Sequence, residues 1–108
     1  MNNNIIIKKM LNYIDKILTY CRNTDYEKFR NNTLLTDGCV FNLSQLGELA
    51  AKIDTDFAEN HSEIPWKQMR GLRNKIVHDY EGVNLLLVWE IISDDLPKLK
   101  EMLQSIER

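Results

Sequence analysis

Residues 5–22 read IIIKKMLNYIDKILTYCR, and this stretch decides the fold class. Its apolar residues recur at steps of three and four, which places them on one side of an α-helix with 3.6 residues per turn. They are Ile7, Met10, Leu11, Ile14, Ile17, Leu18 and Cys21. The pattern predicts an amphipathic helix from Ile5 to Arg22 that covers a core with this stripe.

The same spacing recurs along the rest of the chain, and no segment alternates as a half-buried strand would. It predicts a short helix at 25–30 after an N-cap at Thr24, and a central helix over 34–57 with Asp37-Gly38 as its weakest point. A further helix is expected from Pro65 to about Tyr80, stopped by Glu81-Gly82, and another over 83–92. A last segment to 106 is expected to follow a cap region at Ser93-Asp94-Asp95, and a kink at Pro97 is left open. We therefore expect an all-α, antiparallel bundle of four to five helices, in a single domain over residues 1–108.

Length and composition narrow the class of protein. The chain has 108 residues, 44% apolar and 28% charged, which suits one globular domain and excludes a disordered chain. Its longest apolar runs are too short to span a bilayer, and the Met1-Asn2-Asn3-Asn4 start does not resemble a signal peptide. We expect a cytoplasmic protein with no membrane partner. Cys21 and Cys39 lack metal-site spacing and are expected in the core rather than in a disulfide or zinc site.

The formal charge of -2 argues against unspecific binding of nucleic acid, but the charge is unevenly distributed. Residues 64–78 contain no acidic side chain. The same window contains Lys67, Arg70, Arg73, Lys75 and His78. An anion-binding site is expected there.

A helical wheel over residues 66–80 gives this window two features. Arg73 falls inside the apolar arc, where a guanidinium costs free energy unless it meets an anion or several acceptors. Arg70, Asn74 and His78 follow at four-residue steps as a polar stripe beside the arc. Arg73 and His78 point about 140° apart on a straight helix, so a second copy of the chain would complete a shared site more readily, which predicts a homodimer.

The window and its surroundings resemble a known family. The run RNKIVHDY at 73–80 is similar to the signature of an Arg, four residues, a His, any residue and a Tyr that marks the HEPN superfamily, and specifically its HepT-like toxins. The resemblance extends over residues 5–106 through LGELA at 46–50, IPW at 64–66, MRGLRN at 69–74, VW at 88–89 and DLPKL at 95–99. It implies an HEPN-type helical bundle.

The resemblance also implies a metal-independent ribonuclease without a cofactor, with Arg73 and His78 as its catalytic pair. RNA carries its own nucleophile in the 2'-hydroxyl, so an imidazole that moves protons and a guanidinium that stabilises the phosphorane-like charge suffice. Asn74 is expected to orient the phosphate or the imidazole. Arg70, Lys67 and Lys75 are expected to guide the RNA backbone, although both lysines are equally explained as solvated helix positions.

In HepT-like toxins the Tyr of the signature receives AMP from a nucleotidyltransferase antitoxin, which implies this modification for Tyr80. AMP on the phenol would compete with the RNA phosphate by charge and by volume. The helical wheel instead turns Tyr80 toward the core, so a half-buried packing role stays open for it.

Other candidate residues have structural explanations. A metal site at His61 with Glu59 and Glu63 is not expected. Trp66 and Trp89 lie within apolar stripes and are expected in the bundle core or a dimer contact. The Asp94-Asp95 pair is expected to cap a helix.

Two other function classes stay open beside the ribonuclease. A non-catalytic module could use the same basic window to hold a nucleotide or to dock a nucleotidyltransferase. A purely structural dimeric bundle would use Arg73 for folding alone.

Overall fold

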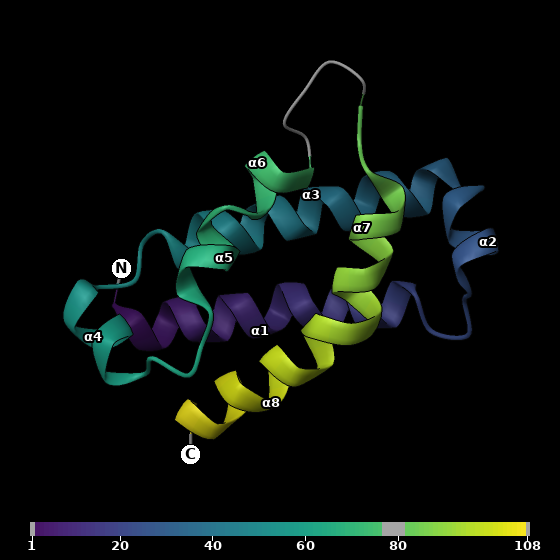
Figure 1. Cartoon of the computed structure of the whole chain (residues 1–108). Helices are drawn as coiled ribbons and strands as arrows, with labels where there is room; N and C mark the ends of the chain where they lie inside the picture. The colour runs from purple at the N-terminus through teal and green to yellow at the C-terminus, as the bar shows by residue number, and fades with distance from the viewer. Residues whose placement is uncertain (1, 77–81, 108) are drawn as a thin grey trace.

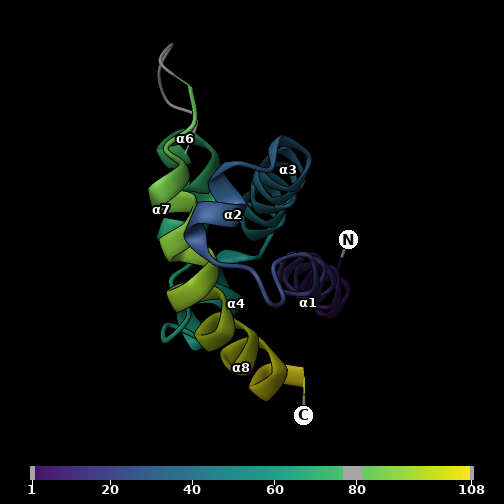
Figure 2. The same cartoon turned by 90° about the vertical axis from the view of Figure 1, so that its right-hand side faces the viewer.

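The computed structural model describes residues 2–76 and 82–107, which form helices with no strand among them, so the all-α prediction is confirmed. The two longest helices, α1 (Asn3–Tyr20) and α3 (Thr33–Ala50), lie side by side and run in opposite directions (Figure 1). Seen along these helices in Figure 2, α1 and α3 form one layer of the molecule.

The second layer packs across this pair and carries the candidate site. It consists of α5 (Trp66–Arg70), α6 (Leu72–Ile76), α7 (Leu85–Glu90) and α8 (Leu96–Glu107). α5 and α6 lie against α3, and α8 lies against α1 (Figures 1 and 2). The short helices α2 (Tyr26–Arg30) and α4 (Thr55–Asn60) lie at opposite ends of the bundle.

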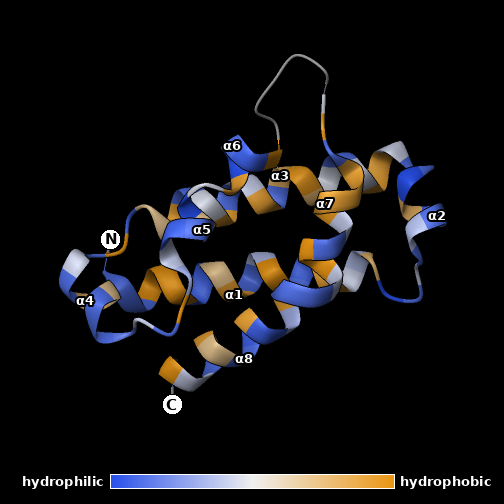
Figure 3. Cartoon of the chain, viewed as in Figure 1, coloured by the Kyte–Doolittle hydropathy of each residue, from blue (hydrophilic) through white to orange (hydrophobic). Residues whose placement is uncertain are grey.

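The core lies between the two layers, where the apolar sides of the helices meet (Figure 3). The apolar stripe predicted for the first helix is buried there. Side chains with 2% exposure or less include Ile7, Met10, Ile14, Ile17, Phe29, Leu43, Leu46, Ile64, Ile76, Leu96 and Leu103. Burying each such large side chain stabilises the fold by about 1.5–3 kcal/mol. Within residues 2–76 and 82–107, every helix is too short or too polar to cross a membrane.

Cys21 and Cys39 are both buried, as predicted, and join the end of α1 to α3. Their Sγ atoms are 3.6 Å apart, within hydrogen-bonding distance for thiols. The hydrogen bond from Cys39 lowers the pKa of Cys21. The hydrogen bond with Cys21, together with burial, raises the pKa of Cys39 well above its usual value. Both cysteines are free thiols.

The first two helices begin at side-chain caps. α1 begins two residues earlier than predicted because the Asn2 side chain accepts a hydrogen bond from the Ile5 N–H at 2.9 Å. α2 ends at Arg30 as predicted but begins one residue later, because its N-cap is Asp25, whose Oδ1 accepts from the Lys28 N–H at 2.8 Å. The prediction of Thr24 as the cap is therefore wrong by one residue.

The central helix is shorter than predicted. α3 continues through Asp37-Gly38 but ends at Ala50, and α4 begins only at Thr55. The turn between them is tied to the start of α1, because Asn3 Nδ2 donates to Asp54 Oδ2 at 3.2 Å and the Asp54 N–H donates to Asn3 Oδ1 at 3.3 Å. These bonds join residues 51 apart in sequence, so no local pattern could indicate them.

The C-terminal helices are continuous, so the predicted cap region at 93–95 is wrong. A π-helical turn, η1 (Ile91–Asp95), joins α7 to α8, and the Leu96 N–H donates to the Ile91 carbonyl five residues back. Pro97 accounts for this turn, since its ring would clash with the carbonyl four residues earlier in a regular α-helix and it has no N–H to donate. α7 begins at Leu85, two residues later than predicted, and its N-cap is Asn84, whose Oδ1 accepts from the Leu87 N–H at 3.1 Å.

Candidate functional site

The predicted helix over 65–80 is interrupted in the middle of the basic window. α5 covers Trp66–Arg70, and Gly71 forms a turn before α6 begins at Leu72. Pro65 precedes the first turn of α5, where its missing N–H is harmless. The indole N–H of Trp66 donates to the carbonyl of His61 at 3.0 Å and fixes the start of α5.

The turn at Gly71 is placed by close contact with α3. A Cβ atom added to Gly47 would lie 2.8 Å from the Met69 carbonyl oxygen and 3.7 Å from the Leu72 Cβ. Only glycine at this position lets the backbone at the junction of α5 and α6 approach α3 so closely. Gly47 thereby sets the distance between α3 and α6, the helix that carries the basic side chains.

The interruption changes the exposure of Arg73. Leu72 and Ile76 face the core from α6, whereas Arg73, Asn74 and Lys75 are exposed. The prediction that Arg73 lies within the apolar arc is therefore wrong. Its physical reason is the turn at Gly71, which breaks the continuous helical phase on which the wheel over 66–80 depends. An exposed guanidinium is available to an anionic ligand and takes no part in the packing of the core.

The predicted stripe of Arg70, Asn74 and His78 is also divided. Arg70 lies on α5 and Asn74 on α6, on either side of the turn. His78 and Tyr80 lie outside the described residues, so their geometry with Arg73 stays a prediction. Lys67 and Arg70 line an open hollow together with Glu59 and Glu63, which offset part of their positive charge. The two basic side chains on α5 thus share their surroundings with carboxylates.

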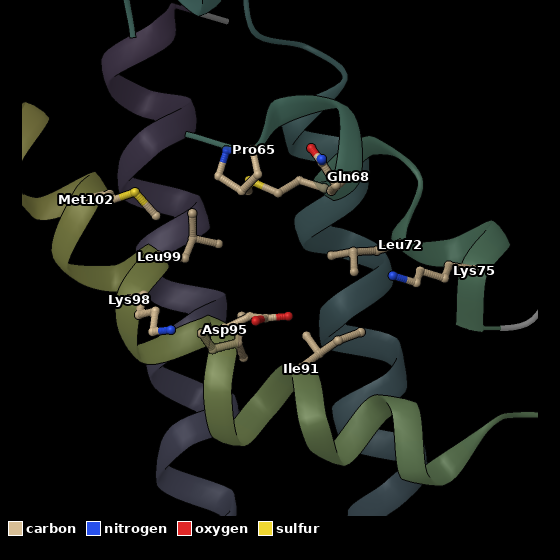
Figure 4. A pocket seen from close by; sticks show the side chains of 11 residues that line it. Pro65, Gln68, Leu72, Lys75, Ile91, Asp95, Lys98, Leu99 and Met102 are labelled. Carbon is tan, nitrogen blue, oxygen red and sulfur yellow. The ribbon is translucent and has the colours of Figure 1, made fainter. Parts of the chain in front are cut away.

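Lys75 lines a different depression, a groove of about 300 Å³ between α5–α6 and the η1–α8 segment (Figure 4). Asp95 and Lys98 lie on the opposite side of this groove. Figure 4 shows the ammonium group of Lys75 and the carboxylate of Asp95 directed toward the groove from its two sides. The structure therefore separates the window into the α5 hollow, the exposed tip of Arg73 and Asn74, and this groove.

The remaining candidates occupy structural positions. His61 packs against Phe57 with ring centroids 4.5 Å apart and the ring planes tilted by 40°, and its Nδ1 lies 3.8 Å from Glu63 Oε1. Among the residues that the structure describes, no three His, Cys, Asp or Glu side chains gather around one point that a metal ion could occupy. Trp66 is buried in the core as predicted, and Trp89 packs on Phe29 with centroids 5.1 Å apart.

Sequence reasoning missed the groove and the part that Lys98 plays in it. Lys98 is separated from the basic window by about twenty residues and becomes its neighbour only because α8 lines the same groove as α5 and α6. A usable signal was the spacing of Asp95 and Lys98, which are three residues apart and so share one side of a helix.

Comparisons with known proteins show the family to which the chain belongs. A family described as "Ribonuclease HepT-like" matches residues 10–106, nearly the whole chain. The chain belongs to the HepT-like ribonuclease family. Similar relatives include two from Methanocaldococcus jannaschii, named "Putative RNase MJ1216" and "Putative RNase MJ1380", at 36% and 32% identity, each over 90% of this chain and over 80% and 89% of the relative.

A third relative, named "Probable ribonuclease HepT" and found in Thermococcus cleftensis, is 30% identical over 88% of this chain and 86% of its own length. The chain therefore corresponds to most of the length of each of these three relatives. A comparison with solved structures found no match.

Proposed function

We propose that this HepT-like chain is a metal-independent ribonuclease that acts as the toxin of a type VII toxin–antitoxin system. The observation that carries the proposal is the exposed Arg73 on α6, in a window without acidic residues that falls within the family match. An exposed, permanently charged guanidinium can bind non-bridging phosphate oxygens through two parallel N–H donors.

In the proposed reaction the 2'-hydroxyl of RNA attacks the adjacent phosphorus, and the bond to the 5'-oxygen breaks. His78 takes the hydroxyl proton or returns one to the leaving oxygen, since an imidazole titrates near neutral pH. Arg73 stabilises the extra charge on the phosphorane-like transition state. Asn74 orients the phosphate or the imidazole, and the product end is a 2',3'-cyclic phosphate.

The proposed active form is a homodimer in which two copies of the window face one another around a two-fold axis. Such an arrangement brings two imidazoles and two guanidinium groups to one RNA strand. Lys75 contributes to the electrostatic attraction of RNA, and Lys67 and Arg70 contribute less because Glu59 and Glu63 lie beside them.

The regulation that we propose acts through Tyr80. A cognate nucleotidyltransferase attaches AMP to its hydroxyl, which introduces a phosphate and a nucleoside beside the RNA site. The added group competes with the RNA phosphate and stops cleavage. The unmodified ribonuclease would damage the RNA of its own cell. We therefore expect the protein to be in the cytoplasm in complex with the nucleotidyltransferase, and to carry AMP.

The central experiment measures cleavage of RNA by the purified protein in EDTA, with mapping of the product ends. Arg73→Ala and His78→Ala should each reduce the rate by at least about a hundredfold, the usual scale for losing one charge-stabilising or proton-transfer group. Arg22→Ala is the matched control, because Arg22 is exposed and lies far along the chain from the window. Unchanged cleavage in either variant would reject the pair, and binding of nucleotide without cleavage would favour the non-catalytic module.

The modification is tested by intact mass after coexpression with the nucleotidyltransferase. The wild-type chain should gain whole AMP units and lose its ribonuclease activity, and Tyr80→Phe should gain none. Tyr20→Phe serves as the control, since Tyr20 is a half-exposed tyrosine outside the window. AMP on the Tyr80→Phe variant would show that another residue is the acceptor.

A further inference from the structure

The groove beside α6 has an apolar floor that could hold a flat ring. Its volume of about 300 Å³ lies at the small end of ligand pockets, the size class that holds one small molecule. Five of its lining side chains are buried, namely Met69, Leu72, Ile91, Leu96 and Leu99. Pro65 and the half-buried Met102 complete the walls.

The rim of the groove is polar and carries charges of both signs. Gln68 and Lys75 come from α5 and α6, and Asp95 and Lys98 come from η1 and α8. All four side chains are exposed. Figure 4 shows them around the apolar floor, with the carboxylate of Asp95 directed toward Leu72 across the groove. A purely apolar partner would remove these charged groups from solvent without offering an opposite charge, which costs free energy.

We propose that this groove binds one nucleobase of the RNA substrate, and that Asp95 selects guanine. The proposal rests on the ribonuclease function proposed above and deepens it by naming a base preference. Single-stranded RNA is recognised in proteins by bases that are splayed out, held between apolar or aromatic surfaces and read along their hydrogen-bonding edges.

The chemistry of the lining matches a base better than another occupant. The leucine and isoleucine side chains offer surface to the faces of the ring, and the thioethers of Met69 and Met102 make favourable contacts with aromatic rings. An ionised carboxylate only accepts hydrogen bonds. Guanine presents adjacent N–H donors at N1 and N2, so it can pair with both oxygens of Asp95, whereas no other RNA base offers two such donors side by side.

The remaining rim groups fit the rest of the nucleotide. The amide of Gln68 can donate to the guanine O6, and the two lysines carry the positive charge that a phosphate flanking the base requires. Lys98 lies three residues after Asp95, on the same side of the helix. A base bound against Asp95 therefore has a cation within reach for its own phosphate.

The groove is also near enough to the proposed cleavage point. Arg73 and Lys75 are two residues apart on α6 and leave the helix in nearly opposite directions. The groove therefore lies about one helix diameter, or ~10 Å, from Arg73. A strand covers this distance with about three stacked nucleotides. The selected guanine should occupy one fixed position within a few nucleotides of the cut.

The first test maps cleavage sites on an RNA library of randomised sequence. The wild-type protein should enrich guanine at one fixed position near the cut, and Asp95→Asn should reduce this enrichment about tenfold, because an amide presents a donor where the carboxylate presented an acceptor. Asp94→Asn is the matched control, since Asp94 is exposed in the same turn but does not line the groove. Cleavage by the wild type without guanine enrichment, or with enrichment unchanged in Asp95→Asn, would overturn the proposal.

A second test does not depend on cleavage. The methyl signals of methionine are followed by NMR while GMP, AMP, CMP or UMP is added. GMP should shift the signals of Met69 and Met102 and leave that of Met10, which is fully buried in α1. If the protein cleaves no RNA, the ribonuclease proposal fails while this titration still decides on the base site.

Two outcomes of the titration would overturn the base site. One is an absence of shifts with GMP at both groove methionines. The other is a shift of these signals with protein concentration alone, which would show that a second copy of the chain covers the groove. Equal shifts with all four nucleotides would retain a base site but reject the selection of guanine by Asp95.

Discussion

Replacing Gly47 by alanine tests the contact that places the candidate site. The new Cβ would lie 2.8 Å from the Met69 carbonyl oxygen, about 0.6 Å inside the 3.4 Å at which ordinary contact begins. The opposing atom belongs to the backbone, so relief requires the junction of α5 and α6 to move away from α3. Overpacking of this kind costs about 1–3 kcal/mol.

A gain in helix propensity opposes this cost. Alanine in place of glycine inside a helix stabilises by about 1 kcal/mol. Gly47→Ala should therefore change the free energy of unfolding by between about zero and a loss of 2 kcal/mol. Gly38→Ala is the matched control in the same helix, because its Cβ would meet only the Tyr20 ring at 4.0 Å. It should gain close to the full 1 kcal/mol.

The assay is urea unfolding of both variants, followed by circular dichroism. The two stabilities should differ by about 1–3 kcal/mol, which corresponds to a difference in Tm of at least about 4 °C. The RNA cleavage rate should fall in Gly47→Ala alone, since only that substitution displaces α6. Equal stabilisation of the two variants would refute the close approach of the junction to α3.

Three further predictions concern caps, core and surface. Asp25→Ala should destabilise the protein by about 1 kcal/mol in urea unfolding because the Lys28 N–H loses its acceptor, while Thr24→Ala should have a smaller effect; the reverse order would restore Thr24 as the cap. Leu103→Ala, in the fully buried stripe of α8, should cost about 2–5 kcal/mol by the same assay, and a loss under 1 kcal/mol would contradict the packing of α8 on α1. The exposed ion pair between Lys100 and Asp15, at 2.8 Å, should contribute about 0–1 kcal/mol in a double-mutant cycle and less in high salt, whereas a larger, salt-independent coupling would contradict its exposure.

Most of the helices could be predicted from sequence because their signal is local. The apolar stripe of α1 and the range of α2 follow from residue spacing within a few turns. The ends of the helices could not be predicted in the same way. Asn2, Asp25 and Asn84 are the capping residues. Asn2 and Asp25 have neighbours that also favour an N-cap, namely Asn3, Asn4, Asn23 and Thr24.

The candidate site was predicted in composition but not in arrangement. The absence of acidic residues over 64–78 and the signature at 73–80 are properties of the sequence alone. The wheel that placed Arg73 in the core assumed an uninterrupted helix, and the turn at Gly71 removes that assumption. The exposure of Arg73 therefore depends on how the junction of α5 and α6 packs against α3.

By itself the sequence determined the helical class, the buried stripes and the family, because each depends on residues close together or on an ordered set of motifs. Only the tertiary structure decided where α3 stops, how the basic window is divided, and that Asp95 and Lys98 meet Lys75 across one groove. The physical reason is that these features arise from contacts between residues tens of positions apart. Periodicity sets which side of a helix is apolar. The packing of one helix against another sets where the helix ends and which polar side chains of the two helices lie close together.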